Sequence, residues 1–311
     1  MVSSQIALHA SHGGVVPELA ARAHLEGLST VVDAALAPMP GGWDDIDAVA
    51  VTRGPGLAGC LIVGTMYASG AALARGLPIV GVSHLAGHVY SAWLADPGLE
   101  PPYLALLVSG GHTECVVLHE HGRAERLSAT RDDAAGEAFD KVARLIGLEY
   151  PGGPAIQRVA ADGDPTRFPL PRTRVEGAFS FSGLKTAVRY MVRDLGAGSL
   201  TPAGAPKDPQ VVADLAASFQ VAAVEQLVTG LVAAADRCAA STVAVVGGVA
   251  ANRALREAVA ARFKGLRVAV PPFDLCTDNA AMIAAAGWHR LRVHGADAPG
   301  FDVDPSLAEC A

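Results

Sequence analysis

Short apolar runs alternate with longer segments of helical character along most of this chain. We interpret seven runs as strands, at 47–52, 78–82, 103–108, 114–118, 123–127, 242–246 and 266–270. The segments that we interpret as helices are 57–74, 84–94, 137–146, 155–161, 182–194, 210–239, 251–263 and 278–293. Strands that alternate with helices are typical of an α/β protein, so we predict that fold class.

Turn-forming residues mark a division of the chain into two lobes. The segment 96–102 is polar and rich in proline and glycine, which predicts a boundary there. We assign residues 1–97 and 289–311 to a first lobe and residues 98–288 to a second. The segment 295–311 has no periodicity, and we expect it to fray.

The composition excludes several classes of protein. Of 311 residues, 51% are hydrophobic and 18% are charged, which is enough apolar material for a sizeable core and excludes a disordered chain or a coiled coil. A net charge of −7 argues against a general basic coat for nucleic acid. One segment, 158–193, is locally basic although the whole chain is acidic. It contains three acidic residues and seven basic ones: Arg158, Arg167, Arg172, Arg174, Lys185, Arg189 and Arg193.

The cysteines and the uncharged stretches indicate a cytoplasmic protein. Five scattered cysteines form neither a disulfide framework nor a zinc ribbon. The first nine residues lack the pattern of a secretory signal. The segment 54–74 carries no charge, but it contains five glycines, and we interpret it as a glycine loop and a buried helix rather than a membrane span.

Glycine-rich loops follow three of the predicted strands. The loop 54–59 matches G-x-G-x-x-G, but no acidic residue follows within 20 positions and Pro55 removes an amide donor, which argues against a dinucleotide site. Gly110-Gly111 and Gly247-Gly248 end two other strands, and the second pair leads into a helix. Such loops either make tight turns or present backbone amides to a phosphate; two of them favour a nucleotide cleft between the lobes.

A histidine pair is the clearest candidate for metal binding. His84 and His88 are four residues apart, so on a helix both imidazoles face the same side. Asp278 is a candidate third ligand, although an aspartate at that position is also a good helix cap. Leu85 occupies the place where a zinc peptidase has its glutamate, which argues against a peptidase. Without a third ligand, the pair would be ordinary surface histidines.

Taken together, the motifs identify a family. The chain resembles the tRNA N6-adenosine threonylcarbamoyltransferases, the TsaD/Gcp family, over roughly residues 2–290. The motifs that carry the resemblance are 13–20 (GGVVPELA), 54–59, 84–88, 107–113, 132–141 (DDAAGEAFDK), 150–154 (YPGGP), 179–186 (FSFSGLKT), 247–253 and 276–279 (CTDN). The resemblance implies a two-lobed actin-like, sugar-kinase-like ATPase fold with a nucleotide cleft between the lobes.

The resemblance also implies a reaction and its site. The family transfers a threonylcarbamoyl group from threonylcarbamoyl-AMP to N6 of the adenosine adjacent to the tRNA anticodon. Its metal ligands carry over onto His84, His88 and Asp278, with one divalent ion per subunit, iron or zinc. Its substrate contacts carry over onto Leu107, Val108, Ser109, Gly110, Gly111, Asp140, Gly153 and Asn252. In bacteria the family works with an inactive paralogue subunit and a small ATPase, and not at a membrane.

Residue chemistry is compatible with this reaction. A metal can polarise the carbamoyl oxygen, and glycine amides can hold the departing phosphate. Asp140 is suited to hydrogen bonds with hydroxyl groups, unless it forms an ion pair beside Glu137 and Lys141. The basic segment 158–193 is either part of the tRNA-binding surface or a solvated loop.

The chain departs from the family pattern at its start. The acidic, glycine-containing hairpin that opens family members is not present before residue 5. Either the chosen start lies downstream of the natural one, or the protein is truly short. A short protein would be impaired or a non-catalytic scaffold, and a carbamoyltransferase acting on a small molecule is a further alternative.

Overall fold

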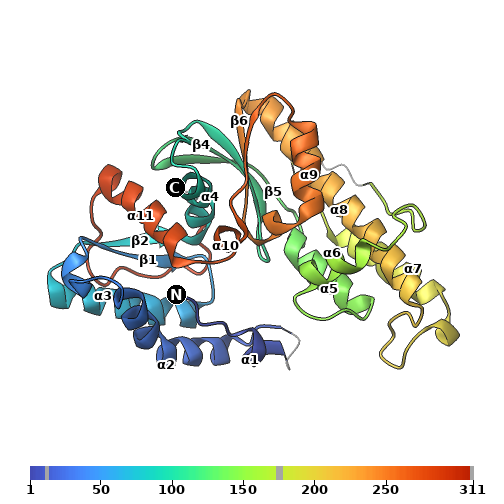
Figure 1. Ribbon diagram of the computed structural model, residues 1–311, viewed down its shortest axis with the longest axis horizontal. Coiled ribbons are helices and arrows are strands. Elements are labelled where there is room, and N and C mark those ends of the chain that lie inside the picture. Colours follow the sequence, from blue (N-terminus) through green and yellow to red (C-terminus); the bar gives the residue numbers. More distant parts are fainter. Residues whose placement is uncertain (11–13, 173–177, 309–311) are drawn as a thin grey trace. The chain divides into compact units, whose positions relative to one another are not determined.

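The computed structural model describes residues 1–10, 14–172 and 178–308, and it divides into two compact units. Unit 1 contains Met1–Leu94, Glu120–Ala124 and the chain from Asp278 onward. Unit 2 contains Ala95–His119 and Glu125–Thr277. Figure 1 shows the elements of both units in the order of the chain.

The division differs from the predicted one mainly near the end of the chain. Residues 278–288, which we expected in the second lobe, belong to unit 1. The reason is helix α11 (Ala280–His294), which packs against both strands of the unit 1 sheet. The turn at Glu120–Ala124 also joins unit 1, which no sequence pattern predicted.

Unit 1 is built on two parallel strands, β1 (Val49–Gly54) and β2 (Ile79–Ser83). Its helices are α1 (Ile6–Ala10), α2 (Pro17–Leu36), α3 (Ala58–Arg75), α4 (His84–Ala95) and α11, with a 3-10 turn η1 (Gly42–Asp45). The predicted helices 57–74, 84–94 and 278–293 are therefore confirmed within a few residues. Helix α2 was not predicted, although Pro17 and Glu18 in its first turn are common start signals.

The segment after α11 is ordered up to residue 308, so the expectation that it frays is wrong. The Asp297 amide donates to Ile79 O (2.9 Å), and its carboxylate accepts from the Gly81 amide (2.8 Å) and pairs with Arg290 (3.0 Å). Further on, the Asp304 amide donates to Arg53 O at 2.8 Å. Backbone hydrogen bonds thus fix this segment along both strands of unit 1.

Unit 2 contains a five-stranded sheet in the order β5-β4-β3-β6-β7. Strands β3 and β4 form an antiparallel pair, whereas β6 and β7 run parallel to β3. The strands are β3 (Tyr103–Val108), β4 (Thr113–Glu120), β5 (Arg123–Ala129), β6 (Thr242–Val246) and β7 (Arg267–Ala269). The helices are α5 (Ala135–Leu145), α6 (Gly152–Ala160), α7 (Ser182–Asp194), α8 (Pro209–Cys238), α9 (Arg253–Arg262) and α10 (Phe273–Cys276), with 3-10 turns η2 (Ala197–Ser199) and η3 (Gly248–Ala251).

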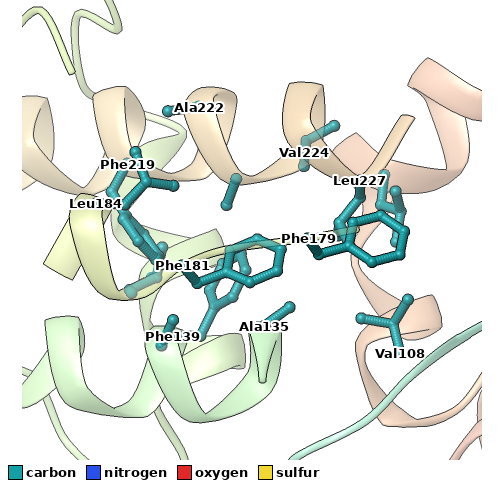
Figure 2. Close-up of a cluster of buried hydrophobic side chains, with 14 of the residues drawn as sticks. Val108, Ala135, Phe139, Phe179, Phe181, Leu184, Phe219, Ala222, Val224 and Leu227 are labelled. Carbon is teal, nitrogen blue, oxygen red and sulfur yellow. The ribbon is translucent and has the colours of Figure 1, made fainter. Parts of the chain in front are cut away.

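The core of unit 2 is organised around α8. Figure 2 shows Phe179, Phe181 and Leu184 between this helix and α5, and the rings of Phe139 and Phe219 meet edge to face at 5.0 Å. Among the described residues, α8 is the one helix long and apolar enough to span a membrane. Its buried residues belong to this core, which accounts for its apolar composition.

Gly287 offers a test of how α11 is held on the sheet. A Cβ there would lie 2.6 Å from Ala50 Cβ, so Gly287→Ala is expected to lower the free energy of unfolding by about 1–3 kcal/mol. Gly70→Ala is the matched control, since nothing lies within 4 Å of that position in α3, and it should gain about 0.5–1 kcal/mol. Urea unfolding measures both; equal effects at the two positions would contradict close packing of α11.

Candidate functional site

The histidine pair lies at the start of α4, directly after β2. The Ser83 hydroxyl accepts a hydrogen bond from the Ala86 amide (3.5 Å), which caps this helix start. His84 and His88 are one helical turn apart, with ring centroids separated by 4.7 Å. Both imidazoles therefore face the same side, as the spacing predicts.

Asp278 meets both imidazoles with a single oxygen. Its Oδ1 lies 3.4 Å from His84 Nε2 and 3.3 Å from His88 Nε2, and the three ligand atoms lie within 4.8 Å of one another. The cap of α11 is instead the neighbouring residue, because Asn279 Oδ1 accepts from the Met282 amide at 2.8 Å. The capping alternative for Asp278 is thus not what the structure shows.

Burial and charge distinguish this group from ordinary histidines. His88 is fully buried, and within the described part of the chain its Nδ1 has no hydrogen-bond partner, while its Nε2 has only the 3.3 Å contact with Asp278 Oδ1. Unpartnered buried nitrogens are costly unless a ligand satisfies them. Desolvation opposes the charge on Asp278, but the adjacent His84 and His88 more than offset it and hold its pKa well below the usual range.

The residues fit a divalent metal. Two imidazole nitrogens and a carboxylate are common ligands of zinc and of non-haem iron. Metal–ligand distances of about 2.0–2.1 Å at tetrahedral angles separate ligand atoms by about 3.4 Å. The observed distances from Asp278 Oδ1 to the two imidazoles agree with this value.

Close helix packing brings Asp278 to the histidines. Gly87, between the two ligands on α4, lies against α11, and a Cβ there would be 2.7 Å from Ile283 Cδ1 and 3.2 Å from Met282 Cγ. Both are in the first turn of α11, directly after Asp278. The missing side chain at residue 87 therefore allows the approach that forms the triad.

A second group of predicted residues lies in unit 2, where the parallel strands β3 and β6 end. Within the turn from β3 to β4, the Ser109 amide donates to His112 O (2.8 Å) and its hydroxyl accepts from the His112 amide (3.1 Å). A Cβ at Gly110 or Gly111 would meet nothing within 4 Å. These two glycines are open to a ligand, and ligands of α/β proteins bind at such strand ends.

The Gly-Gly pair after β6 divides into a packed and an open residue. Gly247 has a φ of +91°, and a Cβ there would lie 2.5 Å from Val108 O, so packing alone requires glycine. Gly248 has open space where a Cβ would be. The tight-turn alternative thus explains Gly247 and leaves Gly248 unexplained.

Asp140 contacts Gly152 at the start of α6, and Gly153 is the next residue. The Gly152 amide donates to Asp140 Oδ1 at 2.7 Å, and Gly152 packs on the Asp140 backbone, whereas Gly153 is open. Desolvation raises the pKa of Asp140, against the lowering effect of the Gly152 hydrogen bond. Lys141 pairs with Glu137 and Asp133, so the ion-pair alternative for Asp140 does not describe this structure.

Asn252 is largely occupied by structural hydrogen bonds. Its Oδ1 accepts from the Leu255 amide (3.0 Å) as the cap of α9, and its Nδ2 donates to Gln220 (2.9 Å). Gln157 accepts from the Arg253 amide at 2.6 Å, so two amides of this helix start already have partners. No sequence pattern pointed to either glutamine.

Leu107 and Val108 differ from the other predicted substrate contacts. Both are fully buried and lie within the β3 ladder. Their side chains belong to the core, and their position sets where the loop 109–112 begins.

Hydrogen bonds and ion pairs join the acidic motif 132–141 to the serine-containing motif 179–186. Asp132 accepts from the hydroxyls of Ser180 and Ser182 (both 2.6 Å) and from the Phe181 amide (2.8 Å), which caps α7 from outside the helix. Asp133 pairs with Lys185 (2.6 Å) and Lys141 (2.9 Å). The motifs 132–141 and 179–186 thus form one structural clasp in unit 2.

The basic segment 158–193 is less positive than its sequence suggests. Arg174 lies outside the described residues. Five of the other basic side chains form ion pairs: Arg158 with Glu149, Arg167 with Asp214, Arg172 with Glu225, Lys185 with Asp133 and Arg193 with Asp194. Arg189 stacks over the Tyr190 ring at 5.4 Å. Exposed pairs are weak, so Arg172 and Arg193 can still exchange their partners for phosphates.

Comparison with known proteins agrees with the motifs. A family model described as TsaD, tRNA N6-adenosine threonylcarbamoyltransferase, matches residues 1–285. The protein of that name from Synechococcus sp. (strain JA-3-3Ab) is 53% identical to this chain, over 94% of this chain and 79% of the relative. The protein of that name from Anaeromyxobacter dehalogenans (strain 2CP-1) is 50% identical, over 98% of this chain and 91% of the relative.

Solved structures with a similar fold include two of HypF. Full-length HypF in its phosphate- and nucleotide-bound form has a TM-score of 0.58 over 81% of this chain and 40% of HypF. HypF from T. kodakarensis has a TM-score of 0.59 over 80% and 41%. At 14% identity both show the fold alone, which confirms the predicted actin-like α/β class.

The Asp132 clasp predicts a pH-dependent stability. Desolvation works against the Asp132 charge, but its hydrogen bonds from Ser180 and Ser182 lower its pKa. Because the pKa of Asp132 is lower in the folded than in the unfolded protein, its charged form stabilises the fold. This stabilisation is fully present above the unfolded-state pKa and is lost as the pH falls through the folded-state pKa. Asp132→Ala should cost about 1–2 kcal/mol at pH 7, and its difference from the wild type should shrink in acid. Urea unfolding against pH measures this, with the exposed Asp236→Ala as control; a pH-independent difference would contradict it.

Proposed function

Because the chain belongs to the TsaD family of tRNA N6-adenosine threonylcarbamoyltransferases, we propose that it transfers a threonylcarbamoyl group from threonylcarbamoyl-AMP to tRNA. The adenosine N6 attacks the carbamoyl carbon, the bond to the phosphate oxygen breaks, AMP leaves and N6 loses a proton. The acceptor is the adenosine adjacent to the anticodon. The observation that carries the proposal is the convergence of His84, His88 and Asp278 in a chain that matches the family over residues 1–285.

We propose that these three residues hold one divalent ion, iron or zinc. Such an ion acts as a Lewis acid and a template toward a carbamoyl or threonyl oxygen. The proposal is supported by buried His88, whose Nε2 contacts only Asp278 Oδ1 among the described residues, and by the sharing of that oxygen with His84. The same convergence disfavours a non-catalytic scaffold, which has no use for three ligands.

The open glycines support a site for the donor in unit 2. Amides of Gly110, Gly111 and Gly248 can approach a phosphate without side-chain obstruction. Asp140, whose Oδ1 is held by Gly152, can accept from a donor hydroxyl beside the open Gly153. We propose Ser109 and Asn252 as further contacts to the donor. Leu107 and Val108 are proposed to position the loop 109–112 through their places in β3.

We also propose the bacterial partners that the resemblance implies, an inactive paralogue subunit and a small ATPase. An apolar face on α3 supports the paralogue: Ile62, Met66 and Leu73 are exposed on a helix with one charged residue, Arg75. We propose a cytoplasmic location, which the free thiols at the four described cysteines support.

Removal of the histidine pair tests the reaction. His84→Ala and His88→Ala are expected to lose bound metal and threonylcarbamoyl transfer together, by at least about 100-fold in rate. The assay combines the protein with its bacterial partners, threonine, bicarbonate, ATP and unmodified tRNA, and detects modified adenosine by mass spectrometry. His119→Ala is the control, since His119 pairs with Glu125 outside the triad. Full transfer by the two variants would refute the metal assignment, and a wild type inactive on tRNA would refute the function.

The basic segment is tested with charge reversals. We propose that Arg172 and Arg189 contact the tRNA backbone, so Arg172→Glu with Arg189→Glu should weaken tRNA binding and lower its salt slope by about 2. The control pair is Arg22→Glu with Arg262→Glu, which changes the charge equally outside the segment. Filter binding over a range of salt concentrations measures both; equal weakening by the two pairs would indicate a general charge effect and reject this surface.

A further inference from the structure

We infer that Asn279 is a positioning residue for the metal site: its side chain fixes the backbone that presents Asp278 to the two histidines. The inference rests on the metal proposed above. It assigns a specific task to a residue that contributes no ligand atom to the triad.

The first step is that Asp278 depends on its backbone for its position. The Asp278 side chain is 77% exposed, in contrast to 22% for His84 and 1% for His88. Packing therefore holds the two imidazoles, whereas the contacts recorded for the carboxylate are those with the imidazoles themselves. Asp278 also lies outside regular structure, between α10 and α11.

The second step is that Asn279 anchors this backbone immediately after Asp278. Asn279 has extended backbone angles, and its Oδ1 accepts from the Met282 amide at 2.8 Å. This is the bond of a helix N-cap to the third helical residue, and it defines where α11 begins. The direction in which the chain leaves the helix, and with it the Cα of Asp278, is thereby fixed.

The third step connects the cap to the histidines. Met282, whose amide the cap holds, is 1% exposed, and its side chain packs at Gly87 on α4, between His84 and His88. Asn279 thus ties the residue carrying the carboxylate to the residue that touches the histidine helix. Asparagine provides this cap without a second negative charge beside Asp278, whereas aspartate would add one.

Cobalt titration of metal-free full-length protein tests the inference without any activity measurement. Co²⁺ bound by two histidines and a carboxylate gives visible absorption bands that report affinity and ligand geometry. Asn279→Ala is expected to weaken Co²⁺ binding by about 10–100-fold and to change the bands, as loss of supporting residues around a metal does. Asn279→Ser restores a neutral cap and should bind within about 3-fold of the wild type.

A second helix cap separates positioning from general stability. Asp208 caps α8 in unit 2 through the Gln210 amide at 2.9 Å, so Asp208→Ala removes a comparable cap outside unit 1. It should lower the melting temperature but leave Co²⁺ affinity unchanged. Wild-type affinity and bands in Asn279→Ala, or equal weakening by Asp208→Ala, would overturn the positioning role and leave the metal intact. A wild type that binds no Co²⁺, or His88→Ala binding normally, would overturn the metal proposal and the inference with it.

Discussion

The contact between α4 and α11 is the constraint on which the triad of His84, His88 and Asp278 depends. Both helices pack in unit 1, and glycines lie at two of the contacts that place α11: Gly87 of α4 faces the first turn of α11, and Gly287 of α11 faces Ala50 on β1. Steric repulsion rises steeply once atoms come closer than their contact distance, so such close contacts define position more narrowly than the flexible side chains around them. Asp278 lies 190 residues after His88 along the chain, and this packing brings it to the histidine pair.

The sequence predicted the part of the site that has its own periodicity. His84 and His88 follow from the i, i+4 spacing on a helix. Asp278 was a candidate from its residue type, but local sequence cannot distinguish a ligand from a helix cap, and the family resemblance favoured the ligand. Only the structure shows that Asn279 fills the cap position. The Gly-Gly pairs show the same limit. In the pairs 152–153 and 247–248 the first glycine is packed against its neighbours and the second is open, and only the residues nearby in space determine which is which.

Most of the fold followed from the apolar pattern, and its failures have physical causes. Helix α2 has one buried residue, Ala20, so few core-facing positions mark it, although Pro17 and Glu18 stand in its first turn. The segment after α11 binds through backbone amides and carbonyls, which leave no periodicity for a pattern to reveal. The charge count in the segment 158–193 was correct, but the partners of Arg167 and Arg172 lie on α8, beyond the counted range.

The return of the chain to the first strands has a consequence for biosynthesis. Unit 2 is a nearly continuous stretch of the chain, interrupted only at Glu120–Ala124, whereas unit 1 draws on three segments that include residues beyond 290. Chains emerge from the ribosome at roughly 5–20 residues per second, and domains fold as their residues become available. Unit 2 can therefore pack while β1 and β2 still lack α11 and the segment around Asp297. The triad of His84, His88 and Asp278 therefore cannot form before synthesis has passed Asp278.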